Sequence, residues 1–190
     1  MIAAPGTSDF GLRTSDVSPN SLAPTTTLAQ PVAAPTAPRV LLLGLGNDIL
    51  TDDAIGLHVV RRLQAQLAGH ASVDVRETTE MGLALLDFMT GYSAVVIVDS
   101  IQTGRSAPGT VHELDAAALK QLTGRTPHFL GVGETLALGG HLGLAMPEQV
   151  RIFAIEVEDP FTLNTDMTPA LEAALPGIVE RIAARLKALA

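Results

Sequence analysis

The sequence predicts a doubly wound α/β domain, because continuous apolar runs of strand length alternate with segments of helical periodicity. Two runs, 40–45 (VLLLGL) and 93–99 (SAVVIVD), are apolar at nearly every position, as expected for central strands of a parallel sheet. Between them, residues 51–68 place apolar side chains along one helical face. Ligands of such sheets bind outside the carboxyl ends of the strands, so candidate functional residues are sought there.

The remaining elements continue the alternation along the chain. The sequence predicts a strand at 73–77, a short helix at 81–89, an edge strand at 108–114, a helix at 129–138 and a strand at 149–157. No internal repeat is visible, so these elements form one sheet and not an array.

A final helix is predicted to begin at Thr168 and Pro169, a favourable pair for the N-cap and first helical positions. Apolar residues keep one stripe along this segment to Leu186. The Pro176-Gly177 pair is expected to kink or split the helix.

The first 38 residues differ in composition from the rest of the chain. They hold six of the twelve prolines, with many Ala, Thr and Ser and few charges. They lack the basic start and apolar stretch of a secretory signal. We therefore expect residues 1–38 to form a disordered extension, residues 39–190 to form a single domain, and the protein to be cytoplasmic.

Composition excludes several functional classes. Twelve Lys and Arg against twenty Asp and Glu give a net charge of −8, which argues against nucleic acid as a partner. The longest apolar runs are too short to cross a membrane. The absence of cysteine excludes disulfides, thiolate metal ligands and a Cys nucleophile, so any metal must be bound by oxygen or imidazole.

The turn GLGNDILTDDAIG (44–56) begins like a dinucleotide-binding loop but is acidic. Gly44 and Gly46 fit the first two glycines of that fingerprint, while Ile49 occupies the third position. Asp52 and Asp53 would also repel a pyrophosphate at the start of the helix. A nucleotide-binding function is therefore disfavoured.

The three aspartates of this turn have different expected roles. Asp48 is expected to be a solvated turn residue, and either Thr51 or Asp52 can cap the helix. Asp53 is the acid that these roles leave unexplained. Asp99 ends the apolar run 94–98 and is expected at the same edge of the sheet, where two like charges need a cation or a shared proton.

An imidazole would complete a site for nickel or zinc. His128 stands out because Pro127 precedes it, but spacing alone does not select one histidine. The candidates are His58, His70, His112, His128 and His141.

Three motifs in the same order, GLGNDILTDDAIG, VIVDSIQ (96–102) and TPHFLGV (126–132), resemble the hydrogenase maturation proteases. The resemblance extends from about Val40 to the MTPALEAALP stretch (167–176). The residues of the first motif that fit the family pattern are Gly44, Gly46, Asn47, Leu50, Asp52, Asp53 and Gly56.

The resemblance implies a three-layer sandwich with a twisted, mostly parallel sheet of about five strands flanked by helices. It also implies that Asp53, Asp99 and His128 are the metal-binding and catalytic residues. The expected activity is that of an aspartyl-type endopeptidase that removes the C-terminal extension of a nickel-iron hydrogenase large-subunit precursor. The nickel is expected to be in the precursor, and the protease is expected to be a monomer.

Several alternatives stay open at the level of sequence. A non-proteolytic nickel-binding maturation chaperone could use the same three residues. A nucleotide-binding α/β protein and a peptidase of the same fold with another substrate are further alternatives. For the peptidase, the attacking water could be activated by the metal or by an aspartate acting as general base.

Overall fold

The computed structural model describes residues 39–115 and 132–187. The predicted extension 1–38 lies outside this range, so its boundary with the domain stays a prediction. In the described part, five strands form one sheet in the order β2-β1-β3-β5-β4. The strands are β1 (Val40–Leu45), β2 (Val73–Thr78), β3 (Ala94–Ile101), β4 (Val111–Asp115) and β5 (Gln149–Glu156).

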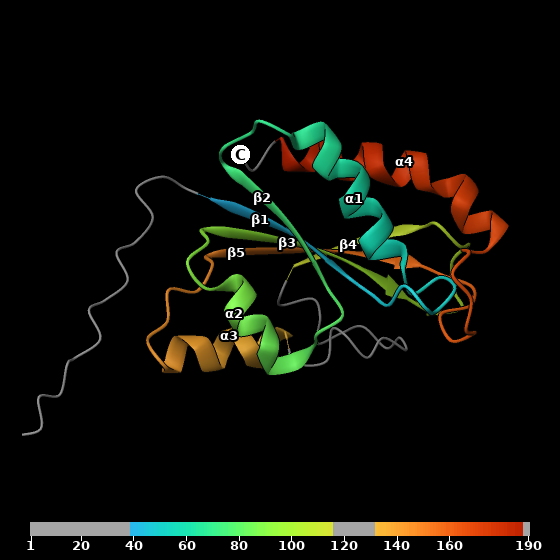
Figure 1. Cartoon of the computed structure of the whole chain (residues 1–190). Coiled ribbons are helices and arrows are strands. Elements are labelled where there is room, and N and C mark those ends of the chain that lie inside the picture. Colours follow the sequence, from blue (N-terminus) through green and yellow to red (C-terminus); the bar gives the residue numbers. More distant parts are fainter. Residues whose placement is uncertain (1–38, 116–131, 188–190) are drawn as a thin grey trace, which may run out of the picture. The chain divides into compact units, whose positions relative to one another are not determined.

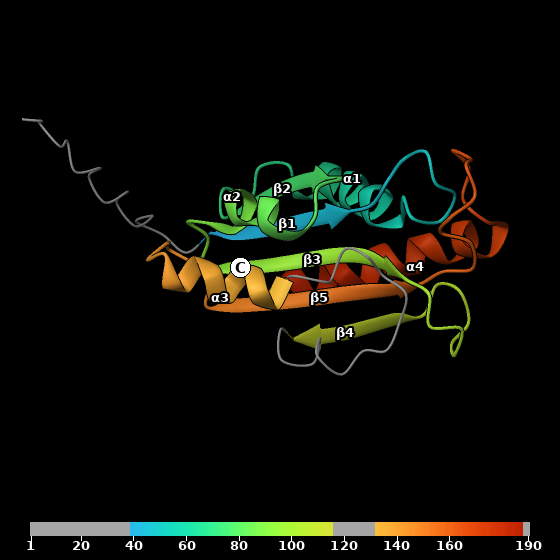
Figure 2. The same cartoon turned by 90° about the horizontal axis from the view of Figure 1, so that it is seen from below.

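The sheet is mostly parallel. Strands β2, β1, β3 and β5 pair in parallel, whereas β4 pairs antiparallel with β5 at the edge, where its arrow is reversed (Figure 2). Strand β1 has β2 on one side and β3 on the other, so the chain reverses its winding direction at β1. Ligands of α/β sheets bind at such a switch point.

Helices cover both faces of this sheet, which completes three layers (Figure 1). Helices α1 and α4 lie on one face, and α2 and α3 lie on the other. Their bounds are α1 (Ile55–Leu67), α2 (Leu85–Met89), α3 (Val132–His141) and α4 (Pro169–Leu186), with a 3₁₀ turn, η1 (Gly82–Ala84), before α2. The predicted fold class is confirmed.

Each face of the sheet has its own apolar core. Leu42, Val96 and Phe153 face α1 and α4, while Leu43, Ile97 and Ile152 face α2 and α3. Side chains of a strand alternate between faces, so the largely apolar strands β1, β3 and β5 supply both cores at once. The central strands are thereby fixed in position, and so are the loops that follow their carboxyl ends.

Several elements differ from the predictions in their bounds or, for α4, in continuity. Helix α1 begins at Ile55 and not at residue 51, and β3 continues beyond Asp99 to Ile101. Helix α4 runs through Pro176 without being split. Buried Leu171 and Leu175 precede this proline, and buried Ile178 follows it. Their packing offsets the loss of about 3 kcal/mol that an internal proline causes.

None of the described helices combines the length and apolarity needed to cross a bilayer.

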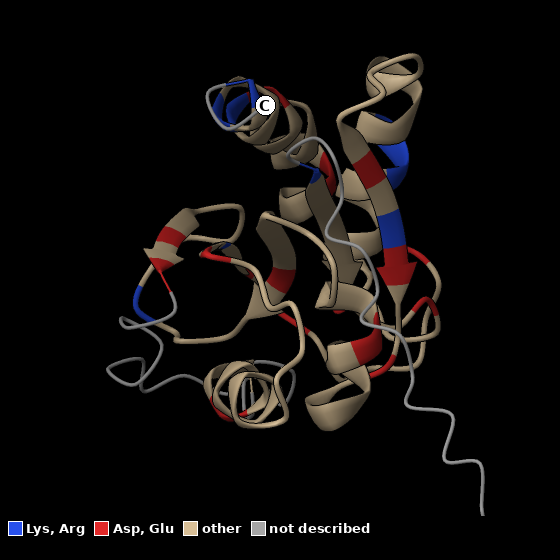
Figure 3. Cartoon of the chain, turned by 90° about the vertical axis from the view of Figure 1, so that its left-hand side faces the viewer, with Lys and Arg blue, Asp and Glu red and all other residues tan. Residues whose placement is uncertain are grey.

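The charged residues are spread over the described part of the chain. Figure 3 shows its Lys and Arg positions as short, separate segments, with Asp and Glu positions among them.

Candidate functional site

The two predicted acids meet at the switch point through one residue, Ser100. The Ser100 hydroxyl donates a hydrogen bond of 2.8 Å to Asp53 Oδ1, and the Ser100 amide donates one of 2.8 Å to Asp99 Oδ1. All three residues are buried, with exposed fractions of 5% for Asp53, 0% for Asp99 and 3% for Ser100. The sequence therefore predicted correctly that Asp53 and Asp99 lie at one edge of the sheet.

The glycines of the acidic turn allow α1 to lie close against the strands. A Cβ atom on Gly56 would lie 2.1 Å from the carbonyl oxygen of Leu45 and 2.5 Å from that of Val98. At Gly46, where φ is +149°, a Cβ would lie 2.2 Å from the carbonyl oxygen of Asp53. Gly56 thus provides the close helix–strand contact that a dinucleotide fingerprint assigns to its third glycine, without a phosphate loop.

Asp52 is a structural anchor and does not cap α1. The α1 N-cap is Ala54, which forms no side-chain capping bond. Asp52 instead accepts hydrogen bonds from the amides of Glu158, Asp159 and Thr168, at 3.1, 3.0 and 2.8 Å, and from the Thr168 hydroxyl at 3.1 Å. The predicted capping role is wrong because donors distant in sequence occupy this carboxylate.

The loop before α4 also pairs with the acidic turn through its backbone. The Thr51 amide donates to the Thr162 carbonyl at 3.0 Å, and the Asn164 amide donates to the Ile49 carbonyl at 3.1 Å. The Thr51 hydroxyl donates a hydrogen bond of 2.8 Å to the same Thr162 carbonyl, so Thr51 does not cap the helix either. The turn that carries Asp53 is therefore held on two sides, by β3 and by the β5–α4 loop.

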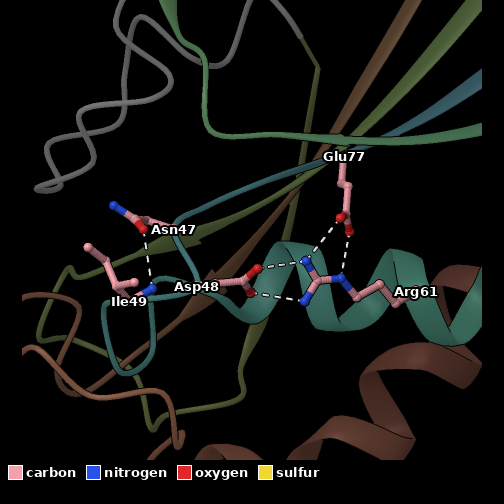
Figure 4. A network of polar contacts seen from close by, with 5 residues as sticks. All are labelled: Asn47, Asp48, Ile49, Arg61 and Glu77. Carbon is pink, nitrogen blue, oxygen red and sulfur yellow. Dashed lines mark hydrogen bonds and ion pairs between the residues drawn. The ribbon is translucent and has the colours of Figure 1, made fainter.

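Asp48 forms a charged network with Arg61 and Glu77 (Figure 4). The Arg61 guanidinium donates two hydrogen bonds to Asp48, at 2.9 and 2.7 Å, and two to Glu77, at 2.6 and 2.9 Å. These bonds lower the pKa of Asp48 and raise the pKa of Arg61. Asp48 is exposed, as expected, but it is paired. Beside it, Asn47 accepts a hydrogen bond from the Ile49 amide at 3.2 Å, which shapes the turn.

The structure shows a further buried acid, Glu156, which was not predicted from the sequence. It ends β5 with an exposed fraction of 1% and accepts hydrogen bonds from the Thr103 and Gly104 amides, both at 2.8 Å, and from the Thr103 hydroxyl at 2.7 Å. His112 Nε2 lies 3.3 Å from its second oxygen. Burial alone would raise the pKa of Glu156. The hydrogen bonds from Thr103 and Gly104 outweigh this effect, so the pKa lies below its usual value. The sequence signal that could have identified Glu156 is an acidic residue in an otherwise apolar strand.

His128, the predicted imidazole, lies outside the described residues, so its position stays a prediction. His58 is half-buried on α1, and burial lowers its pKa. His112 belongs to the Glu156 cluster, while His70 and His141 are exposed. Within 39–115 and 132–187, no three His, Asp or Glu side chains are grouped as metal ligands.

Two buried carboxylates that bond to the same residue can act in a limited number of ways. Such a pair can share a proton, accept a proton from water, or bind a cation. Carboxylate oxygens suit hard cations, and an added imidazole suits borderline metals such as nickel. The fold and the site together define an α/β protein whose acidic centre lies at the switch point of its sheet.

Known proteins are similar to this chain in sequence and in fold. The family model described as hydrogenase maturation protease matches residues 57–185, a range that includes Asp99 and begins just after Asp53. The hydrogenase 2 maturation protease of Escherichia coli (strain K12) is 28% identical over 151 residues, covering 78% of this chain and 91% of the relative. The hydrogenase expression/formation protein HupD of Rhizobium leguminosarum bv. viciae is 24% identical over 157 residues, covering 81% and 77%.

Solved structures agree with these sequence relatives. The hydrogenase maturating endopeptidase HybD from E. coli aligns with a TM-score of 0.65 and 27% identity, over 78% of this chain and 92% of that one. The NiFe hydrogenase maturation protease HybD from Thermococcus kodakarensis aligns with a TM-score of 0.60 and 28% identity, over 78% and 98%. The chain belongs to the hydrogenase maturation protease family.

Proposed function

We propose that this protein is an endopeptidase that removes the C-terminal extension of a nickel-iron hydrogenase large-subunit precursor after nickel insertion. The observation that supports the site is the pair of buried carboxylates, Asp53 and Asp99, each 2.8 Å from an atom of Ser100. Family membership supports the peptidase activity and the kind of substrate.

In this proposal the nickel arrives as part of the substrate. Asp53 and Asp99 contact it at the carboxyl edge of the sheet, and His128 adds the imidazole that nickel favours. Three protein ligands leave coordination positions for the ligands that the precursor supplies. A precursor without nickel would bring no cation to the two buried carboxylates. Cleavage would therefore occur only after nickel has been inserted.

Water is the nucleophile in this proposal. The chain has no cysteine and no HExxH motif, which removes two common alternatives. The water oxygen attacks the scissile carbonyl carbon, one of its protons passes to a carboxylate, and the amine leaves with a proton. The water would be activated either by an aspartate of the pair acting as general base or by polarisation on the precursor's metal.

The test is a processing assay with nickel-loaded and nickel-free precursors, read by intact mass. Wild-type protein should shorten only the nickel-loaded form. Asp53→Asn and Asp99→Asn should each slow cleavage at least about 100-fold. Asp48→Asn is the matched control, because Asp48 lies in the same turn but pairs with Arg61 at the surface.

Two results would contradict the proposal. Normal cleavage by both Asp53→Asn and Asp99→Asn proteins would refute the site. Tight binding of the nickel-loaded precursor without any mass change would favour a nickel-binding chaperone. We place this activity in the cytoplasm and in a monomer, which fractionation and light scattering check.

A further inference from the structure

Ser100 contacts both acids of the candidate site, although they come from different elements. We infer that Ser100 is a positioning residue, whose hydroxyl holds the Asp53 carboxylate in the orientation that meets the precursor's metal together with Asp99. This inference rests on the proposed function, and it adds a side chain to which neither the family motif nor the charge pattern assigned a role.

The local geometry of β3 allows one residue to serve two carboxylates. Side chains alternate between the faces of a strand, so the side chains of Asp99 and Ser100 leave β3 in opposite directions. The Ser100 hydroxyl therefore reaches Asp53 in the turn before α1, at 2.8 Å, while its amide reaches back to Asp99, also at 2.8 Å. Ser100 therefore bonds to both carboxylates at once, to Asp53 Oδ1 through its hydroxyl and to Asp99 Oδ1 through its amide.

Ser100 is itself rigid. It lies in the central strand β3, opposite Ile155 of β5, and is 3% exposed. Asp53 lies in the turn that precedes α1, and its side chain has two rotatable bonds. A hydrogen bond from a fixed donor therefore restricts the orientation of the Asp53 carboxylate. Hydrogen bonds to charged acceptors are among the stronger ones in proteins.

A serine is not needed here for packing. The other residues of β3 around it are Ala, Val and Ile apart from Asp99, and an alanine would fill nearly the same volume. The Ser100 hydroxyl has one proton, and that proton is donated to Asp53 Oδ1. The presence of serine at position 100 is therefore explained by its hydrogen bond to Asp53.

The first experiment compares Ser100→Ala with the wild type and with Ser93→Ala. Ser93 is the matched control, because its hydroxyl donates at 3.0 Å to the Arg39 carbonyl at the opposite end of the same strand. Affinity is measured by calorimetry for nickel-loaded and for nickel-free precursor. Ser100→Ala should weaken binding of the loaded form about tenfold and leave the nickel-free form unchanged, since the lost bond acts through Asp53. Ser93→Ala should change neither.

The second experiment separates positioning from general stability. Ser100→Thr, which keeps the hydroxyl, should restore most of the affinity for the loaded precursor. Adding Ser100→Ala to Asp53→Ala should cause no further loss, because Asp53→Ala already removes the carboxylate that the Ser100 hydroxyl holds. Thermal unfolding of every variant shows whether the domain itself has been weakened.

The outcomes distinguish this inference from the function on which it rests. If the wild type does not cut the nickel-loaded precursor, the proposed function fails and the inference fails with it. If the wild type cuts and Ser100→Ala binds loaded precursor equally well, only the role of Ser100 is overturned. Equal losses for loaded and nickel-free precursor would also overturn it, by showing a structural role.

Discussion

Asp52 and Thr168 form a two-point contact between the acidic turn and the start of α4. The Thr168 amide donates to Asp52 Oδ1 at 2.8 Å, and the Thr168 hydroxyl donates to Oδ2 at 3.1 Å. Asp52 and Asp53 are adjacent in sequence, yet the Asp52 carboxylate joins two loops and the Asp53 carboxylate accepts a hydrogen bond from Ser100 of β3. Substitution of Asp52 should therefore lower mainly the stability of the domain, whereas substitution of Asp53 should lower mainly its activity.

Asp52→Asn should lower the free energy of unfolding by about 3 kcal/mol, because an amide NH₂ group would face backbone donors at a fully buried position. Asp53→Asn should change it by less than about 1 kcal/mol. Urea unfolding followed by far-ultraviolet circular dichroism measures both in a protein without tryptophan. Equal stability of the two variants would contradict the anchor role of Asp52.

Stability at acid pH should depend on Glu156. Its pKa is lowered in the folded state, so its contribution is fully present above the usual carboxyl pKa and is lost as the pH falls through the lowered value. Glu156→Gln keeps the shape but removes the titration. Melting temperatures from about pH 7 to pH 2 should therefore fall more steeply in the wild type than in Glu156→Gln. Parallel curves would show that Glu156 does not carry this dependence.

Gly56→Ala should destabilise the domain by about 3 kcal/mol, since its Cβ would overlap two strand carbonyls and must push α1 away from the sheet. The shift would also move Asp53, so processing should fall as well. Gly140→Ala is the control: Gly140 lies in α3, and a Cβ there meets no atom within 4 Å. Alanine should stabilise that helix slightly. Thermal unfolding compares the two.

Arg61→Ala should reduce stability by only about 1 kcal/mol, because both of its ion pairs are exposed to solvent. The loss should shrink in about 1 M NaCl, where the Debye length is near 3 Å. Arg61→Lys should lose less than Arg61→Ala, since an ammonium keeps the charge but cannot form the paired hydrogen bonds to Asp48 and Glu77. Unfolding at low and high salt measures these differences, and a salt-independent loss would contradict a surface electrostatic role.

The strands and their positions could be predicted from the sequence because they depend on local patterns. The bounds of β1, Val40–Leu45, match the apolar run residue by residue. The start of α1 could not be predicted, because Thr51 and Asp52 look like caps and their hydrogen bonds go to residues more than a hundred positions away. Local propensity favours a cap, and tertiary donors overrule it.

The candidate site was predicted in part. Asp53 and Asp99 were found because acids at the carboxyl ends of neighbouring strands converge. Ser100 was missed because β3 continues beyond its predicted end at Asp99. Glu156 was missed because it was counted as an ordinary position of the predicted strand 149–157. A hydroxyl or an acid in an otherwise apolar strand marks a buried polar contact, and that signal was available.

The anchor at Asp52 also governs when the site can form during synthesis. Its donors lie 106 to 116 residues further along the chain, so most of the domain is made before the last of them exists. Until residues 158–168 have left the ribosome, this buried carboxylate lacks its full set of donors, and the turn carrying Asp53 lacks its contacts on that side. A chain shortened before Glu158 would keep both site aspartates but lose every one of these donors. The hydrogen bonds of Asp52 thus make an ordered site conditional on a complete chain.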